Sequence, residues 1–417
     1  MTDDTRRQAV LEPPYRTVLK PYGHALVELA RQRPEIVCLS GDLTRQCEID
    51  LFQAAFPDRF IHAGMAESNM IGVAGALARS GLIPFVHTFG VFATRRPLDQ
   101  IVNAVAYPHL PVRLIGFMPG VSSPGGPSHQ AIEDVALMRA LPGMTIVDMA
   151  DATETAQVVA AIADLPGPVY LRLKRGEIPV IFPEDHQLSL DHAQVLVSGC
   201  DRTRRAAGTA GGGVTTGGGV ARGGAQIEGG AVTTGGGVTR GGAETSGRGG
   251  TGGGTRSVAD VKGQVRTPAA IPGSDVVLLV SGMMVAPALA AARVLRSAGI
   301  ATVVLNIPVI KPLDAATVLA AAAATQTVIT AENHSIIGGL GSAVAEALAE
   351  AALRRPLHRL GLQDTYAEGA KTPSYLFTKY GLTVQHLIDA AWSALHQPGT
   401  PPRSTSPPAG EGEYAPV

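Results

Sequence analysis

Glu67 is an acidic residue placed where it could take part in acid–base chemistry. It stands in His62-Ala-Gly-Met-Ala-Glu67-Ser-Asn-Met, where a loop of small residues leads into a helix-length stretch, residues 67–80. A carboxylate at a helix N-terminus is stabilised by the helix dipole, so this segment taken alone is better explained by a structural role. In a desolvated position, a carboxyl group there could instead hold or share a proton.

Two phenylalanines and one histidine could complete a site around Glu67. Phe89 and Phe92 follow a predicted strand in a chain with only 4% aromatic residues. Phenylalanine usually packs in cores, but this pair could also stack on a flat heteroaromatic ligand. A Gly/Pro/Ser loop, residues 120–128, then ends at His129, just before a predicted helix. His129 could be a surface residue at a helix start, or a hydrogen-bonding or proton-transfer partner where α/β proteins bind ligands.

The elements that would position these residues alternate in type along the chain. Short apolar runs, typical of buried strands, occupy residues 36–40, 83–87, 112–117, 144–147, 169–173, 193–198, 276–280, 301–305 and 327–331. Predicted helices occupy residues 67–80, 96–106, 132–140, 153–164, 286–297, 314–323 and 340–351. This alternation indicates parallel sheets covered by helices. We expect an α/β protein with two doubly wound domains and mostly parallel sheets, at residues 12–182 and 190–396.

A glycine-rich low-complexity insertion, residues 202–272, interrupts the second predicted domain. It contains a near-exact repeat, VTTGGGVARGGA at 214–225 and VTTGGGVTRGGA at 232–243. Such a segment buries too little apolar surface to offset its ordering entropy, so we expect it to be disordered. Its position just after the predicted strand at 193–198 suggests a hairpin-like excursion. A Pro-rich tail occupies residues 397–417.

Composition narrows the class of protein. The net charge of −1 provides no general electrostatic attraction for nucleic acid or a membrane surface. Cys38, Cys47 and Cys200 show no CxxC spacing, which favours reduced thiols over a disulfide framework or a zinc site. The sequence contains no stretch of about 18 unbroken apolar residues, the usual length of a membrane span. We therefore expect a soluble, cytoplasmic protein.

Together, the three chemistry-bearing segments resemble the pyrimidine-binding domain of the transketolase family. The resemblance is carried by AGMAESNMIGVAGALA at 63–78, HTFGVFATRRPLDQI at 87–101 and GGPSHQAIEDVALMRALPGM at 125–144, in that order. IVCLSGDLT at 36–44 is similar to the family's first strand and its Asp-bearing turn. SGMMV at 281–285, IKPLD at 310–314 and ENHSIIGGLGS at 332–342 resemble the family's C-terminal domain. In the last of these, His334 and its glycines are interpreted as a packing turn.

The resemblance implies thiamine diphosphate as the cofactor. Glu67 would hydrogen-bond N1′ of its aminopyrimidine and so activate it, which requires an apolar, desolvated setting that keeps a shared proton. Phe92 would stack on the pyrimidine, with Phe89 in the same wall and Asp42 as a further cofactor contact. His129 would lie near the substrate, and Arg175 matches one member of the family's phosphate-binding cluster.

A partner subunit follows from the same resemblance. Complete transketolases carry a Gly-Asp-Gly motif that anchors Mg²⁺ and the diphosphate, and this sequence has none. The chain thus resembles the C-terminal section of a split transketolase, with no metal ligand of its own and Mg²⁺ held mainly by an N-terminal subunit. The pair would form an α₂β₂ heterotetramer and transfer a two-carbon ketol unit from a ketose to an aldose.

The substrate side departs from the family pattern. Phe117 stands where the family has a phosphate-contacting His, and Gly125 replaces an acidic residue. Gln46 stands near the family's Ser, and Val18 or Leu19 near its Arg. Each lost charge-assisted contact would cost about 1.5–3 kcal/mol. We therefore expect a sugar or sugar-phosphate pair other than the standard pentose phosphates.

Three alternatives remain open. The β-subunit of a 2-oxo acid dehydrogenase E1 shares the two-domain layout, and 1-deoxyxylulose-5-phosphate synthase shares the Gly-Pro-Ser/Thr-His-Gln signature. A more distant alternative is a non-catalytic scaffold whose Arg222, Arg240 and Arg248, each followed by Gly-Gly, bind RNA. That insertion lacks interleaved aromatic residues, so the stacking that supports single-strand binding would be missing.

Overall fold

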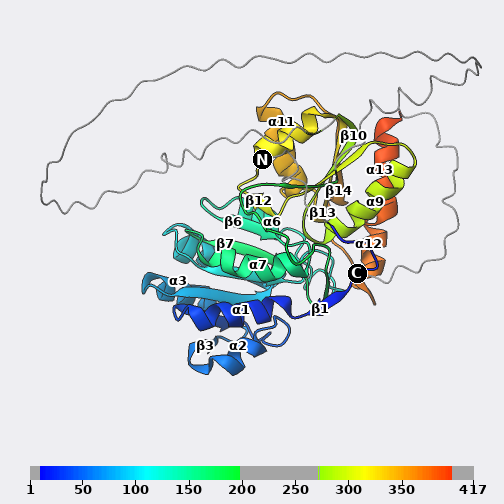
Figure 1. Ribbon diagram of the computed structural model, residues 1–417. Coiled ribbons are helices and arrows are strands. Elements are labelled where there is room, and N and C mark those ends of the chain that lie inside the picture. Colours follow the sequence, from blue (N-terminus) through cyan, green and yellow to red (C-terminus); the bar gives the residue numbers. More distant parts are fainter. Residues whose placement is uncertain (1–9, 198–270, 272, 397–417) are drawn as a thin grey trace, which may run out of the picture. The chain divides into compact units, whose positions relative to one another are not determined.

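The strongest apolar runs form a seven-stranded sheet. The computed structural model describes residues 10–197, 271 and 273–396, so the predictions for most of the insertion and for the tail lie outside the described residues (Figure 1). The sheet order is β12-β6-β7-β5-β4-β2-β3. These strands are Val309–Lys311, Thr145–Asp148, Val169–Leu173, Arg113–Phe117, Ile83–Phe89, Ile36–Ser40 and Phe60–His62. All pairs are parallel except β12 with β6, and the central strands β2, β5 and β7 are buried throughout.

Helices cover both faces of this sheet, as the continuous burial of its strands requires. One face packs on residues of α1 (Pro21–Gln32), α2 (Asp50–Ala55) and α7 (Ala152–Ala163). The other packs on α3 (Glu67–Arg79), the π-helical turn η3 (Ile101–Ala106) and α6 (Asp134–Arg139). Shorter elements are η2 (Pro57–Arg59), α4 (Gly90–Thr94) and α5 (Leu98–Gln100).

The second sheet has five strands in the order β14-β13-β10-β11-β9. They are Leu357–Leu362, Thr325–Ser335, Ser274–Val280, Thr302–Asn306 and Gln194–Val197. Only β9 is antiparallel to its neighbour. Its helices are η5 (Gly282–Met284), α9 (Val285–Ser297), α10 (Ala315–Ala323), α11 (Leu340–Glu350), α12 (Pro373–Lys379) and α13 (Val384–Leu395). A short antiparallel pair, β1 (Thr17–Leu19) and β8 (Glu177–Pro179), stands apart from both sheets.

The predicted fold class, α/β with two mostly parallel sheets, is confirmed. One local prediction is wrong. The hairpin-like placement of the insertion fails because β9 and β10 both pair with β11, which lies between them. The helix expected at residues 96–106 begins two residues later, at Leu98 after Pro97, and α5 continues into the π-helical turn η3 without a gap.

Buried charges connect the two sheets. Arg172 on β7 lies 2.8 Å from carboxylate oxygens of both Asp134 and Asp148. It also donates from Nη2 to the Asn333 carbonyl on β13, at 3.0 Å. Ser281, which follows β10, donates to Asp148 at 3.0 Å. The first sheet is thus fastened to the second by hydrogen-bonded charges as well as by apolar packing.

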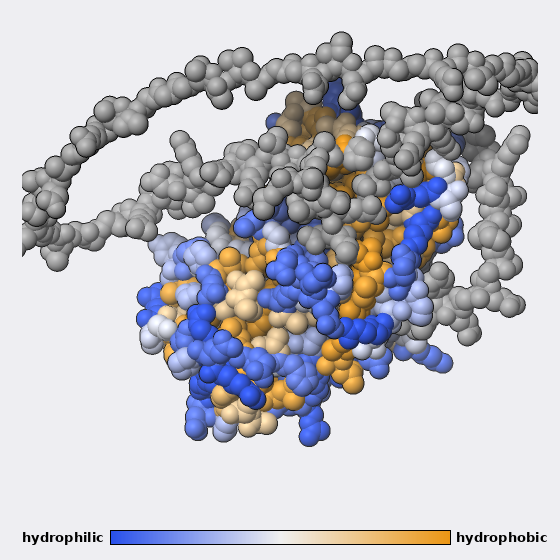
Figure 2. All heavy atoms as spheres, viewed as in Figure 1, coloured by the Kyte–Doolittle hydropathy of each residue, from blue (hydrophilic) through white to orange (hydrophobic). Residues whose placement is uncertain are grey.

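No helix in the described part of the chain is long and apolar enough to span a bilayer. On the face shown in Figure 2, hydrophilic and hydrophobic residues are interspersed.

Candidate active site

The carboxyl ends of the parallel strands in the first sheet bring the predicted site residues to one edge. Asp42 follows β2, Glu67 opens the helix after β3, and Phe89 ends β4. Lys174 and Arg175 follow β7 directly. This is the edge at which open α/β sheets bind ligands.

Glu67 is the first residue of α3, and its side chain is only 4% exposed. Its Oε1 accepts a hydrogen bond from Arg96 Nη1 at 2.7 Å, and the Arg96 side chain is half exposed. The expectation of a desolvated position agrees with this burial. The expectation of an apolar setting is wrong, because a guanidinium cation lies against the carboxylate.

The two phenylalanines expected to form an aromatic wall, Phe92 and Phe89, lie next to the Arg96 guanidinium. Arg96 Cζ is 4.2 Å from the centroid of the Phe92 ring, a cation–π contact. Phe89 stacks on Phe92 with ring centroids 6.0 Å apart, and His129 meets Phe92 edge-on at 5.3 Å. The structure therefore brings Glu67, Phe89, Phe92 and His129 together, with Arg96 in contact with both Glu67 and Phe92.

His129 is held at the end of its loop by local bonds. Its Nδ1 is 2.9 Å from Ser128 Oγ, and its backbone N–H donates to the Gly126 carbonyl at 2.9 Å. Arg95 donates to the carbonyls of Pro127 and Gln130 and pairs with Glu133. The two consecutive arginines thus bind different parts of the site. Arg96 bonds Glu67, whereas Arg95 holds the loop that carries His129.

Asp42 has a different partner from the Glu67 cluster. It follows β2 with a left-handed backbone, φ 66°. Its Oδ1 lies 3.2 Å from His62 Nε2 at the end of the adjacent strand β3, and both side chains are about half exposed. An acidic residue is thus available at this edge, one strand away from Phe89.

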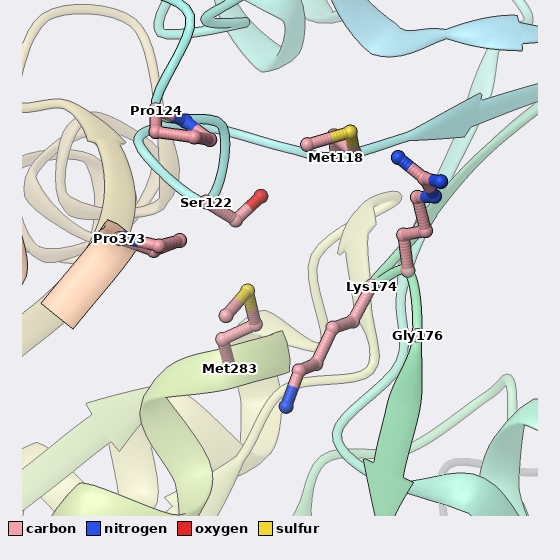
Figure 3. Close-up of a pocket in the computed structure, with 8 residues that line it drawn as sticks. Met118, Ser122, Pro124, Lys174, Gly176, Met283 and Pro373 are labelled. Atoms are coloured by element: carbon pink, nitrogen blue, oxygen red, sulfur yellow. The ribbon is translucent and has the colours of Figure 1, made fainter. Parts of the chain in front are cut away.

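Arg175 lines a pocket of about 340 Å³ rather than the Glu67 cluster. Figure 3 shows Met118, Ser122 and Pro124 on one side and Met283 and Pro373 from the second half of the chain on the other. Lys174 and Gly176 complete the lining. Burial lowers the pKa of Lys174 to about 8, against the opposing effect of Glu177.

Phe117 does not face this pocket. Its side chain is fully buried and meets Tyr22 edge-on, with ring centroids 5.7 Å apart. The residue that we expect to correspond to the family's phosphate-contacting His is therefore part of the core of the first sheet.

Sequence reasoning missed Arg96, Lys174 and Asn333. Arg96 was visible only as a basic residue in the same segment as Phe92, and it lies beyond the end of α4. Lys174 was visible only as a basic residue beside Arg175. Asn333 gave no signal, since its loop partners Val121 and Pro119 lie more than 200 residues away in the chain.

These observations define an α/β protein with a candidate acid–base site. The site consists of a buried carboxylate, a stacked phenylalanine pair and a loop histidine at the carboxyl edge of a parallel sheet. Comparison with known proteins identifies its family. Residues 16–180 match the transketolase pyrimidine-binding domain, and residues 265–387 match the transketolase C-terminal domain.

Full-length relatives agree with both matches. The chain is 34% identical to a 6-deoxy-6-sulfo-D-fructose transketolase subunit of Clostridium sp., over 89% of this chain and 92% of that protein. It is 30% identical to a protein of Methanocaldococcus jannaschii named as a transketolase C-terminal section, over 88% and 93%. A solved split-gene transketolase, described as an inactive β₄ tetramer, is 33% identical with a TM-score of 0.67, over 92% and 99%. The chain belongs to the transketolase family.

Proposed function

We propose that this chain is the pyrimidine-binding subunit of a split, thiamine-diphosphate-dependent transketolase. The observation that carries the proposal is the buried Glu67 carboxylate at the start of α3, adjoining the Phe92–Phe89 wall, in a chain of this family. The names of two relatives, a transketolase subunit and a C-terminal section, support a separate partner. That partner would carry the Gly-Asp-Gly motif and the Mg²⁺–diphosphate anchor.

The residues present fit the aminopyrimidine end of the cofactor. A flat heteroaromatic ring could stack on Phe92 in the place of the Arg96 guanidinium, and a buried carboxyl group matches a ring nitrogen. When bound, thiamine diphosphate supplies an electron sink for carbanion chemistry. Glu67 would hold a hydrogen bond at N1′, Phe92 would orient the ring, and His129 would exchange a proton or hydrogen bond with the substrate. Arg96 occupies the contact between Glu67 and Phe92 and would have to move.

The proposed donor is a ketose with an anionic terminus. Lys174 and Arg175 place two cations at the pocket, while Met118, Met283 and two prolines make the rest of it largely apolar. Phe117 removes one phosphate contact typical of the family, and one relative is named for a sulfonated sugar. A 6-deoxy-6-sulfo ketose is thus the candidate donor in place of the standard pentose phosphates, with an aldose as acceptor.

The test is reconstitution with a candidate N-terminal section. The two chains are co-expressed and titrated with thiamine diphosphate and Mg²⁺, and ketol transfer is then measured from xylulose 5-phosphate and from 6-deoxy-6-sulfofructose. We expect tight, Mg²⁺-dependent binding only in the complex. Full-affinity, Mg²⁺-dependent binding by this chain alone would contradict the shared site. Ordinary turnover of xylulose 5-phosphate would contradict the unusual donor.

Variants and substrates separate the related activities. Glu67→Gln should lower ketol transfer at least about a hundredfold, while Glu184→Gln, an exposed glutamate, should leave it unchanged. Pyruvate with glyceraldehyde 3-phosphate tests for a 1-deoxyxylulose-5-phosphate synthase, and a lipoyl acceptor tests for a 2-oxo acid dehydrogenase. Deleting residues 208–254 tests the RNA-binding alternative, and we expect ketol transfer to survive the deletion.

A further inference from the structure

Asn333 lies on β13 of the second sheet, but its side chain binds the loop that carries His129. Its Oδ1 accepts a hydrogen bond from the Val121 backbone N–H at 2.9 Å, and its Nδ2 donates to the Pro119 carbonyl at 2.9 Å. The residue is only 4% exposed. One amide therefore bonds two buried backbone groups of a loop that has no strand partner at this point, and the Pro119 carbonyl also accepts from the Ser122 hydroxyl at 2.6 Å.

Gly120 makes this close approach possible. It has φ 56°, and a Cβ added to it would overlap both the backbone oxygen and the Oδ1 of Asn333. The Gly120 N–H also donates to the Ala131 carbonyl at 2.9 Å, which joins the two ends of the loop. The Asn333 amide therefore bonds the loop where its two ends meet, beside the hydrogen bond between Gly120 and Ala131.

A second contact holds the middle of the same loop. The Ala370 N–H donates to the Pro124 carbonyl at 2.9 Å, and Gly125 forms an antiparallel bridge with Gly369. Gln130 Nε2, on the loop, donates to the carbonyls of Ser123 at 3.0 Å and Glu368 at 3.1 Å. The second half of the chain thus binds this loop at two places, through Asn333 and through residues 368–370.

The same loop contributes residues both to the pocket and to the cluster around Phe92. Met118, Ser122 and Pro124 line the pocket, and His129 at its far end lies against Phe92. The backbone of Asn333 is itself fixed by the buried Arg172, whose Nη2 donates to its carbonyl at 3.0 Å. Asn333, which holds the loop, is therefore itself held in place by a buried hydrogen bond from Arg172, as a precisely positioned site requires.

We propose that Asn333 is a positioning residue for substrate, through which the second sheet sets the geometry of the pocket and of His129. This role rests on the proposed transketolase function. Asn333 acts through the loop and through Met283, a pocket residue whose sulfur lies 3.7 Å from its Nδ2, whereas Glu67 and Phe92 belong to other elements. Its loss should therefore weaken substrate use and spare cofactor binding.

The first test uses the chain alone. In Asn333→Ala, amide hydrogen exchange across residues 119–131 should become roughly tenfold to a hundredfold faster, because two buried hydrogen bonds are lost. Thr330→Val on the same strand is the matched control, since Thr330 is fully buried and its substitution leaves the loop bonds in place. Unchanged exchange in Asn333→Ala would overturn the proposal. Should that variant fail to fold, Asn333→Asp replaces it, because Asp can accept from Val121 but cannot donate to Pro119.

The second test uses the reconstituted complex. We expect Asn333→Ala to lower kcat/KM for the donor about tenfold or more, mainly through KM, with the Kd for thiamine diphosphate within about twofold of wild type. An equal loss of cofactor affinity would indicate a general structural role and overturn the proposal. If the wild-type complex shows no ketol transfer, the proposed function fails, while the exchange result still decides whether Asn333 holds the loop.

Discussion

At the scale of single residues, the Arg96 guanidinium makes both contacts that a bound aminopyrimidine would need. It is flat and cationic, it lies over the Phe92 ring, and it bonds the Glu67 carboxylate. A buried carboxylate without a partner is costly, so this pairing stabilises the site when the cofactor is absent. Half of the Arg96 side chain remains exposed, which leaves it room to withdraw.

Replacing Arg96 with Met should therefore tighten cofactor binding. The ion pair, which is exposed only on its Arg96 side, and the cation–π contact are each worth about 1 kcal/mol, so we expect the Kd for thiamine diphosphate to fall roughly threefold to thirtyfold. Isothermal titration of the reconstituted complex measures it. Arg96→Lys keeps the charge and should stay near the wild-type value. Weaker binding in Arg96→Met would show that Arg96 supports the cofactor instead of competing with it.

At the scale of elements, Glu48 ties helix α1 to the turn that follows β2. Its carboxylate accepts from the Gly23 N–H at 3.0 Å, and its side chain is almost fully buried. Burial raises the pKa of Glu48 to about 7, against the opposing effects of the Gly23 N–H and Lys20. The folded protein thus retains this proton over a range in which the unfolded chain has already lost it.

Glu48 should make the protein less stable as the pH rises. Its stabilising effect is complete below the unfolded pKa, near 4.5, and is lost as the pH rises through about 7. The free energy of unfolding should fall by up to roughly 3 kcal/mol across this window. Glu48→Gln keeps an oxygen for Gly23 but cannot ionise, so its urea-denaturation stability should fall less between pH 5 and 8. Parallel pH profiles for variant and wild type would contradict this.

The end of strand β7 carries a second pH-dependent group. The pKa of Lys174 is lowered to about 8, so the charge that it places at the pocket is lost as the pH rises through that value. KM for an anionic donor should therefore increase above pH 8 in the wild-type complex. Lys174→Arg should remove this increase, and Lys174→Met should raise KM at every pH. A wild-type KM that stays level from pH 7 to 9 would exclude Lys174 from substrate binding.

Runs of apolar residues in the sequence correctly predicted strands at positions where burial alone determines the secondary structure. Residues 36–40 and 169–173 were predicted as strands and are β2 and β7 with the same bounds. Strand β12 was missed, because three residues carry no periodic signal and its pairing with β6 is set by tertiary packing. Strand β13 runs on through polar Glu332, Asn333 and His334, which are buried because each has polar partners.

The candidate site shows the same division. Glu67, Phe92 and His129 were found because each stands in a distinctive segment, and the structure brings them together. Arg96 and Asn333 were not found, because their importance depends on what they face after folding. Asn333 and Val121 are 212 residues apart in the chain, a separation over which no spacing rule operates.

At the scale of the whole molecule, the buried Arg172 network couples the two halves of the chain. Arg172 and Asp134 are almost completely buried, and Tyr170 also donates to Asp134 at 2.7 Å. Arg172 reaches the second sheet directly through Asn333, and Asp148 reaches it through Ser281. Loss of one member of such a network leaves an uncompensated buried charge, which costs more than the original pair contributed.

Arg172→Met should therefore destabilise both halves of the molecule together. We expect the free energy of unfolding to fall by about 3–5 kcal/mol, because two buried carboxylates lose their common cation. Arg16→Met, which removes an exposed pair with Glu184, is the control and should change it by less than about 1 kcal/mol. Urea denaturation followed by circular dichroism gives the stabilities, and hydrogen exchange locates the loss. Faster exchange on β13 as well as β7 is the expected signature, because Arg172 also holds the Asn333 carbonyl. If only β7 and its neighbours in the first sheet exchange faster, the network stabilises that sheet alone and does not couple it to the second.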